Sequence, residues 1–454
     1  MEKLEDLWLS VTAIKEVPSS INNLTGLRKL YLTGCKELER LPGTIHIKSL
    51  QHLSLLGCSK IDKFPEISEE MVKLEDFWLN DTTIKEVLSS INNLTGLRKL
   101  YLNGCKEMER LPSIIHIKSL QQLSLLGCSK IDKFPQISEA MEKLEDLVLS
   151  ETAIKEVPSS INNLTGLRKL YLADCKELER LPSTIDIKSL QQLSLRGCSK
   201  LKKCPEFSEE MGKLEDLWLN VTAIKEVPSS INNLTGLRKL YVANCKELER
   251  LPSTIHIKSL KQLSLLGCSK IDKCPKFSEE MEKLEHLSLC VTAIKEVPSS
   301  INNLIGLRKL YLKGCKEMER LPSIIHIKSL QQLSLGCSKI DKFPQISEEM
   351  EKLEDLVLSE TAIKEVPSSI NNLTGLRKLY LAGCKELERL PRNINIKSLQ
   401  LLCLGGSSKL KKCPEFSEEM EKLDLWLSVT AIKEVPSSIN NLTGLPLSAW
   451  MFKN

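Results

Sequence analysis

The chain has 454 residues, 27% of them charged, and a formal net charge of +5. This near balance argues against a nucleic-acid-binding or anionic-membrane-binding protein, because both need clustered basic residues. No apolar run approaches the roughly 18–20 residues that span a bilayer, so we expect no membrane span. Because aromatic residues make up only 4%, leucine, isoleucine and valine must form the core.

A long internal repeat organises the chain from its beginning. The segment that opens at Leu4 recurs almost verbatim at a spacing of 70 residues, shortened once to 69. Its first leucine returns at Leu74, Leu144, Leu214, Leu284, Leu353 and Leu423. The sequence therefore holds six full units and part of a seventh. It predicts a solenoid, which grows by adding turns rather than domains.

Each 70-residue unit contains three shorter repeats. The pattern LxxLxL begins at Leu4, Leu27 and Leu50, at intervals of 23, 23 and 24 residues. This period falls within the 20–29 residues of leucine-rich repeats. Because Leu7 and Leu9 are two residues apart, a strand there points both into the core and turns the residue between them outward. We expect about nineteen such strands, paired in one parallel sheet.

The segment after each strand is predicted to be irregular. Its apolar residues, such as Ile14 and Ile21, are unevenly spaced and fit short 3₁₀ turns better than a long helix. Pro18 suits an extended convex side, because proline has no N–H and cannot sit in a paired strand. The predicted fold is an α/β solenoid, a leucine-rich-repeat horseshoe or superhelix with a concave parallel β-sheet. It covers residues 1–445, and residues 446–454 form a non-repeat tail.

Two further motifs point to a particular family. The second turn, from Leu30 to Pro42, has the pattern LxLxxCxxLxxLP, and the third turn is similar. The run PSSIxxLxxL, first seen at residues 18–27, is similar to one in plant intracellular immune receptors. Over residues 4–445 the chain resembles the leucine-rich-repeat region of plant nucleotide-binding disease-resistance proteins, especially those with an N-terminal Toll/interleukin-receptor domain.

This resemblance implies a protein-recognition module of an immune receptor, active in defense signalling and cytoplasmic or nucleo-cytoplasmic. Its concave face would bind a pathogen protein, a guarded host protein or the receptor's own nucleotide-binding domain. The alternative is a free-standing intracellular leucine-rich-repeat scaffold without an immune role.

The chain also departs from that family. The GxxxxGK[ST] phosphate loop is missing from this sequence, so we expect no cofactor. The N-terminus also lacks the basic and apolar segments of a secretory signal. The first residues also enter a repeat directly, without the polar cap that solenoid ends need. We expect a fragment of a larger receptor, a truncated gene product or an incomplete gene model.

The sixteen cysteines are interpreted as reduced structural thiols. Eleven occupy one repeat position, the turn after the strand, where a small polar group can bond exposed backbone of the next turn. Cys204, Cys274 and Cys413 stand where other copies have phenylalanine, so we expect them in the core. No C-x₂₋₄-C pair exists, so no zinc site is predicted. Unpaired cysteines indicate a reducing compartment.

No constellation in the sequence indicates catalysis or metal binding. His46, His116, His256 and His326 recur at one repeat position in separate units, and neighbouring positions lie about 14 Å apart on the predicted convex side, which is too far for joint ligation. No Ser/His/Asp set or pocketed carboxylate pair is recognisable, and an open sheet lacks the closed pocket that catalysis usually needs. We expect a binding protein and not an enzyme.

The outward face of the strands is the candidate protein-binding surface. Trp and Tyr recur there, and both are common interface anchors. The alternative is that aromatic residues merely suit exposed parallel strands, with weak pairing of neighbouring Asp and Lys. Differences between copies also concentrate just after the strand leucines, as where Leu56 becomes Arg196. The predicted binding residues are Trp8, Tyr31, Trp78, Tyr101, Tyr171, Arg196, Trp218, Tyr241, Tyr311, Tyr380 and Trp426.

Overall fold

The structure, a computed structural model, describes residues 4–68, 71–138, 141–343, 345–346, 350–420 and 423–442. The chain forms two compact units, residues 1–237 and 238–454. Each unit is a parallel-sheet solenoid with little helix, which confirms the predicted fold class. The predicted tail at 446–454 lies outside the described residues.

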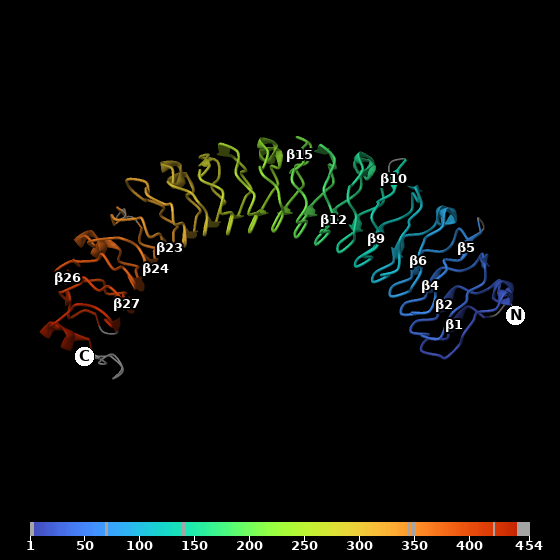
Figure 1. Cartoon of the computed structure of the whole chain (residues 1–454), viewed down its shortest axis with the longest axis horizontal. Helices are drawn as coiled ribbons and strands as arrows, with labels where there is room; N and C mark the ends of the chain where they lie inside the picture. Colours follow the sequence, from blue (N-terminus) through green and yellow to red (C-terminus); the bar gives the residue numbers. More distant parts are fainter. Residues whose placement is uncertain are drawn as a thin grey trace. The chain divides into compact units, whose positions relative to one another are not determined.

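In the first unit, one three-residue strand per turn forms the main sheet, with the strands side by side along the inner margin (Figure 1). Each pairs in parallel with the next, so that Leu7 lies opposite Leu30. The strands are centred where the leucine pattern predicts them. They are β1 (Asp6–Trp8), β2 (Lys29–Tyr31), β4 (His52–Ser54), β6 (Asp76–Trp78), β7 (Lys99–Tyr101), β9 (Gln122–Ser124), β11 (Asp146–Val148), β12 (Lys169–Tyr171), β14 (Gln192–Ser194) and β16 (Asp216–Trp218).

The second unit repeats this arrangement. Its strands also pair in parallel and in register, so that Leu240 lies opposite Leu263. They are β17 (Lys239–Tyr241), β19 (Gln262–Ser264), β21 (His286–Ser288), β22 (Lys309–Tyr311), β23 (Gln332–Ser334), β24 (Asp355–Val357), β25 (Lys378–Tyr380), β27 (Leu401–Cys403) and β29 (Asp424–Trp426).

Alternation along each strand places the leucines in the core, as predicted. Leu30 and Leu32 are 3% and 0% exposed. Burying a leucine side chain contributes about 1.5–3 kcal/mol, so the stacked leucines dominate the stability of each unit. Leu7 and Leu9 are only half-buried, because within the described residues β1 pairs with a strand on one side alone.

The side opposite the main sheet is built from 3₁₀ turns, as predicted. Pro18 precedes the first of them in an extended conformation, with φ −69° and ψ 153°. In the part of the chain that the structure describes, no helix has the length and apolar character needed to cross a bilayer. The 3₁₀ helices are η1 (Ser19–Asn23), η2 (Ser89–Asn93), η3 (Ser159–Asn163), η4 (Ser229–Asn233), η5 (Ser299–Asn303), η6 (Ser368–Asn372) and η7 (Ser437–Asn441).

Short parallel pairs of two-residue strands also lie on this outer side, and the sequence pattern did not predict them. Each pair joins the second and third turns of a 70-residue unit, as where Ile45 lies opposite Ile67. In the first unit they are β3 (Thr44–Ile45) with β5 (Glu66–Ile67), β8 (Ile114–Ile115) with β10 (Gln136–Ile137) and β13 (Thr184–Ile185) with β15 (Glu206–Phe207). In the second they are β18 (Thr254–Ile255) with β20 (Lys276–Phe277) and β26 (Asn393–Ile394) with β28 (Glu415–Phe416).

Candidate functional site

The last residues of the main strands line up, one per strand, in a row that we call the aromatic ladder. In the first unit, cross-strand partners follow the order Trp8, Tyr31, Ser54, Trp78, Tyr101, Ser124, Val148, Tyr171, Ser194 and Trp218. In the second they follow the order Tyr241, Ser264, Ser288, Tyr311, Ser334, Val357, Tyr380, Cys403 and Trp426. The register therefore brings the predicted Trp and Tyr residues of each unit onto one face.

The rings of the aromatic ladder differ in exposure. Trp8 and Trp426 are 65% and 61% exposed, whereas the other predicted Trp and Tyr residues are half-buried. The ring centroids of Trp8 and Tyr31 lie 4.3 Å apart, so neighbouring rings cover part of each other's surface. Arg196 is exposed but lies in the turn after β14 and not on a strand. It belongs to the edge of this surface.

A second row of side chains runs beside the aromatic ladder, two residues earlier in each strand and therefore on the same face. It begins with Asp6, Lys29, His52 and Asp76. The carboxylate of Asp6 lies 3.5 Å from the Lys29 ammonium, and His52 Nδ1 lies 2.9 Å from the Asp76 carboxylate. Solvent-exposed pairs of this kind contribute little to stability, about 0–1 kcal/mol each. The second row therefore gives the surface a pattern of charge and contributes little to the stability of the fold.

The tyrosines of the aromatic ladder are tied to this second row by hydrogen bonds that the sequence analysis missed. Tyr311 donates its hydroxyl to Gln332 Oε1 at 2.7 Å, and Gln332 Nε2 donates to Asp355 at 3.1 Å. Tyr101 donates to Gln122 in the same way. Desolvation raises the pKa of the Tyr101 hydroxyl, which favours its neutral, donating form. These bonds hold the tyrosine rings in place.

The variable position just after the strands has a particular backbone conformation. Gly34 and Gly57 have φ of +72° and +74° there, a left-handed region that glycine adopts freely. Asp174 and Val221 adopt the same conformation, each at φ 59°. A non-glycine residue there costs about 1–2 kcal/mol, and Asp or Asn tolerates it best. The left-handed backbone conformation therefore explains why Gly and Asp occur at this position. Nothing in the structure explains the valines there.

The buried cysteines bond backbone, but in the opposite direction from the one predicted. Cys35 Sγ donates to the Leu9 carbonyl at 3.0 Å, and Cys58 Sγ donates to the Leu32 carbonyl at 3.0 Å. Each carbonyl belongs to the preceding turn, not to the next one. It lies just past the end of its strand, where the thiol of the following turn reaches it.

The prediction that three further cysteines fill the core was only partly right. Cys204, Cys274 and Cys413 are half-buried, whereas Phe64, in the equivalent position, is 6% exposed. A thiol is much shorter than a phenyl ring, so it leaves the margin of the core open. Burial nevertheless raises the pKa of the Cys274 thiol to about 12, which keeps it protonated.

The rate at which each cysteine is alkylated should depend on how deeply its thiol is buried. Burial raises the pKa of the Cys58 thiol to about 11, so little of it is thiolate at pH 8. Cys403 is half-buried on the aromatic ladder. We expect iodoacetamide at pH 8 to label Cys403 at least about tenfold faster than Cys58 in the native protein. Mass spectrometry after denaturation without reductant should show all sixteen thiols alkylated. A stoichiometric bridge between Cys35 and Cys58 would contradict this.

The histidine side chains do not form a cluster. His46, His116 and their equivalents are exposed and belong to different 70-residue units, as expected. His52 instead lies on the main sheet beside Asp76. Within the described ranges, no group of three or more His, Cys, Asp or Glu side chains is placed to hold a metal ion.

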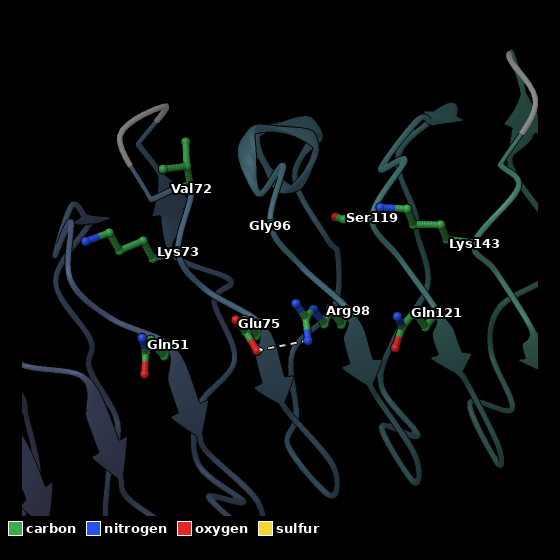
Figure 2. Close-up of a pocket in the computed structure, with 9 residues that line it drawn as sticks. All are labelled: Gln51, Val72, Lys73, Glu75, Gly96, Arg98, Ser119, Gln121 and Lys143. Carbon is green, nitrogen blue, oxygen red and sulfur yellow. Dashed lines mark ion pairs between the residues drawn. The ribbon is translucent and has the colours of Figure 1, made fainter.

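A separate cavity of about 460 Å³ lies on the flank of the first unit, next to the starts of β4, β6, β7 and β9 (Figure 2). We call it the flank groove. Its lining residues are Gln51, Val72, Lys73, Glu75, Gly96, Arg98, Ser119, Gln121 and Lys143. The sequence analysis did not single out these residues. The sequence feature that could have indicated the groove is Val72, because later copies have a glutamate at that position, at Glu142, Glu282 and Glu351.

Two repeat families match this chain. The family described as "Leucine-rich repeat region" matches residues 84–219. The family described as "Disease resistance protein RPS4B-like, leucine-rich repeats" matches residues 46–119, 186–259 and 326–397. Together these matches cover more than half of the chain and lie in both units.

Two proteins with similar sequences come from the plant Arabidopsis thaliana. "Protein SUPPRESSOR OF npr1-1, CONSTITUTIVE 1" of Arabidopsis thaliana is 35% identical over 253 residues, which is 50% of this chain and 17% of that protein. "Disease resistance protein RPP5" of the same plant is 30% identical over 239 residues, 52% of this chain and 14% of that protein. The matched part of this chain thus spans less than a fifth of either relative.

A solved structure supports the fold. The LRR protein LIC12759 of Leptospira interrogans superposes with a TM-score of 0.50 and 21% identity, covering 86% of this chain and 92% of that one. At this identity the likeness concerns the architecture alone. Repeat period, strand register, family matches and relatives agree: the chain belongs to the leucine-rich-repeat family, and its repeats are those of plant disease-resistance proteins.

Proposed function

We propose that this chain is the protein-recognition part of a cytoplasmic plant immune receptor and that it binds its partner on the main sheet. The observation that carries the proposal is the aromatic ladder. In each unit it presents Trp and Tyr on rigid strands, with a row of charged and amide side chains beside it. The named relatives supply the immune context.

The hydrogen bonds of the ladder suit it to binding. Tyr241 Oη donates to Gln262 at 2.5 Å, so this ring is ordered before any partner arrives. Ordering a flexible side chain on binding costs about 0.5–1.5 kcal/mol, and a preordered ring avoids most of that cost. Since the hydroxyl is already bonded and the surface is open, we propose binding and not catalysis.

The proposed partner is a protein: a pathogen protein, a guarded host protein or the receptor's own nucleotide-binding domain. Binding would be coupled to release of an inhibited state of the receptor. The row beside the aromatic ladder repeats neighbouring Asp and Lys residues followed by an amide, as at Asp146, Lys169 and Gln192, which gives a partner's charges a defined register rather than a uniform attraction.

Three alanine variants test the proposal. Trp218→Ala and Tyr241→Ala should weaken binding of an identified partner roughly thirtyfold, the equivalent of about 2 kcal/mol at an interface anchor. Lys15→Ala is the control, because Lys15 is exposed but lies away from the main sheet. Isothermal titration calorimetry gives the affinities, and thermal melting checks the fold. Normal binding by both aromatic variants, with loss of binding by Lys15→Ala, would place the interface elsewhere.

A further inference from the structure

The flank groove is assembled from consecutive turns of the first unit. Figure 2 shows Gln51, Glu75, Arg98 and Gln121 in succession at the starts of neighbouring strands. Val72 and Lys73 lie on the loop that leads into β6, Ser119 lies on the loop that leads into β9, and Lys143 lies on the loop that leads into the next strand, β11. The groove is separate from the aromatic ladder, because the groove residues precede the strands and the ladder is formed by the last residue of each strand. A ligand there would not compete directly for the ladder's rings.

Positive charge predominates in the flank groove. Three of its lining residues are cationic, Lys73, Arg98 and Lys143, and one is acidic. Glu75 lies 3.6 Å from Arg98, in a pair whose side chains are 54% and 40% exposed, so it offsets only part of this charge. Among the described residues, neither Lys73 nor Lys143 has a carboxylate within 4.0 Å.

Other lysines of the first unit differ in this respect. Lys60 lies 2.7 Å from Glu37, and Lys130 lies in an ion pair with Glu107. The repeat thus commonly supplies a carboxylate from the neighbouring turn. Within the described residues, the lysines at the repeat position of Lys73 and Lys143 have no such partner, so their ammonium groups are available to a ligand.

Residue 72 distinguishes this groove within the repeat. Three other copies have Glu142, Glu282 and Glu351 at the same position, and one has Gly212, so Val72 is the one apolar side chain among these five. Val72 removes that carboxylate and places a 51% exposed apolar side chain beside Lys73. The substitution both raises the local positive charge and supplies an apolar contact, a combination that fits a ligand with acidic and apolar groups.

The polar lining fits a peptide backbone. Gln51 and Gln121 carry side-chain amides, each with donors and an acceptor. Ser119 donates its hydroxyl to the Leu97 carbonyl at 2.7 Å, which leaves its oxygen as an acceptor facing the groove. No aromatic side chain lines the groove, whereas single-stranded nucleic acids are held by stacking on aromatic rings.

We propose that the flank groove binds an acidic protein segment in an extended conformation, with one carboxylate on Lys73 and another on Lys143. These lysines precede β6 and β11, which are three strand spacings apart, about 14 Å. An extended chain covers that distance in about four residues. The matching segment therefore carries acidic residues four positions apart with an apolar residue between them.

A fluorescein-labelled peptide containing Glu-Thr-Val-Thr-Glu is the probe, and fluorescence anisotropy with the whole chain is the measurement. We expect salt-sensitive binding that falls at least about tenfold when both glutamates become glutamine, because paired charges carry the affinity. Lys73→Gln combined with Lys143→Gln should reduce affinity to the same degree. Val72→Glu restores the residue of other copies, so it should fold normally and also abolish binding.

Lys283→Gln is the matched control, since Lys283 occupies the repeat position of Lys73 and Lys143 but does not line the flank groove. It should bind the probe normally. Equal binding by the wild-type protein, the double lysine variant and Val72→Glu would overturn the proposal, as would no measurable binding of the acidic probe. Tripolyphosphate or oligothymidylate binding more tightly than the peptide, with the same dependence on Lys73 and Lys143, would identify a phosphate site and also overturn it.

Discussion

Replacing Gly166 with alanine should lower the free energy of unfolding by about 3 kcal/mol, the upper end of the usual cost of overpacking. A Cβ atom at this position would lie 1.8 Å from the Glu142 carbonyl oxygen and 2.6 Å from its carbon. Both are backbone atoms of the preceding turn, so no side-chain rotation relieves the clash. Gly96 and Gly236 make the same approach, each at 2.1 Å, which shows that the repeat requires glycine here.

Gly43→Ala is the matched control for this variant. A Cβ at Gly43 would meet no atom within 4 Å, so we expect a change within about 0.5 kcal/mol. Urea unfolding followed by circular dichroism measures both variants. Equal midpoints for Gly166→Ala and the wild-type protein would mean that the turns are not packed as closely as the structure has them.

Leu170→Ala should cost about 2–5 kcal/mol, while Tyr171→Ala, one residue further along β12, should cost no more than about 1.5 kcal/mol. Leu170 is 1% exposed and packs between the neighbouring turns. Tyr171 is half-buried on the opposite face, where its hydroxyl donates to Gln192. Truncation of the leucine leaves a cavity, whereas truncation of the tyrosine removes one hydrogen bond and exposes surface already in contact with water.

Urea unfolding of the two variants tests this assignment of faces. The reverse order of stability would show that the strand faces are shifted by one residue, because alternation along a strand exchanges every side chain between core and surface. The aromatic residues would then belong to the core and could not serve as interface anchors.

The repeat pattern was sufficient to predict the strands and their faces. Leucines spaced two apart can share a face only on a strand, and the same phase in every turn forces parallel pairing in register. The residues around Leu30, Leu53 and Leu170 therefore lie where their motif places them. The prolines likewise predicted extended segments before 3₁₀ turns, as at Pro18 and Pro158, although Leu88 adopts the same conformation before η2.

The sequence could not predict the contacts that depend on the distance between turns. The Tyr311–Gln332–Asp355 hydrogen bonds join three successive turns, and the pattern within one turn does not show which side chains meet across the gap. The direction of the Cys35 hydrogen bond depends on how far the loop curls back over the preceding turn. The short strand pairs of the outer side, such as β3 with β5, are too brief to produce a recognisable alternation.

The sequence alone identified the candidate protein-binding surface, from the residue types and their positions in the repeat. It did not identify the flank groove. Trp218 and Tyr241 attract attention as aromatic residues that the repeat phase turns away from the core. Lys73 and Lys143 are ordinary charged residues whose importance comes from what surrounds them, and the loss of the glutamate at Val72 is one difference among many between the copies.

The most direct test of the central claim is site-specific photo-crosslinking in plant cells. A benzophenone amino acid at position 171 would project from the main sheet, and one at position 155 would project from the outer side, where Lys155 is exposed. We expect a protein partner to crosslink at position 171 alone and the crosslink to disappear when Trp218→Ala is added. Crosslinking of the same partner only from position 155 would contradict binding by the aromatic ladder.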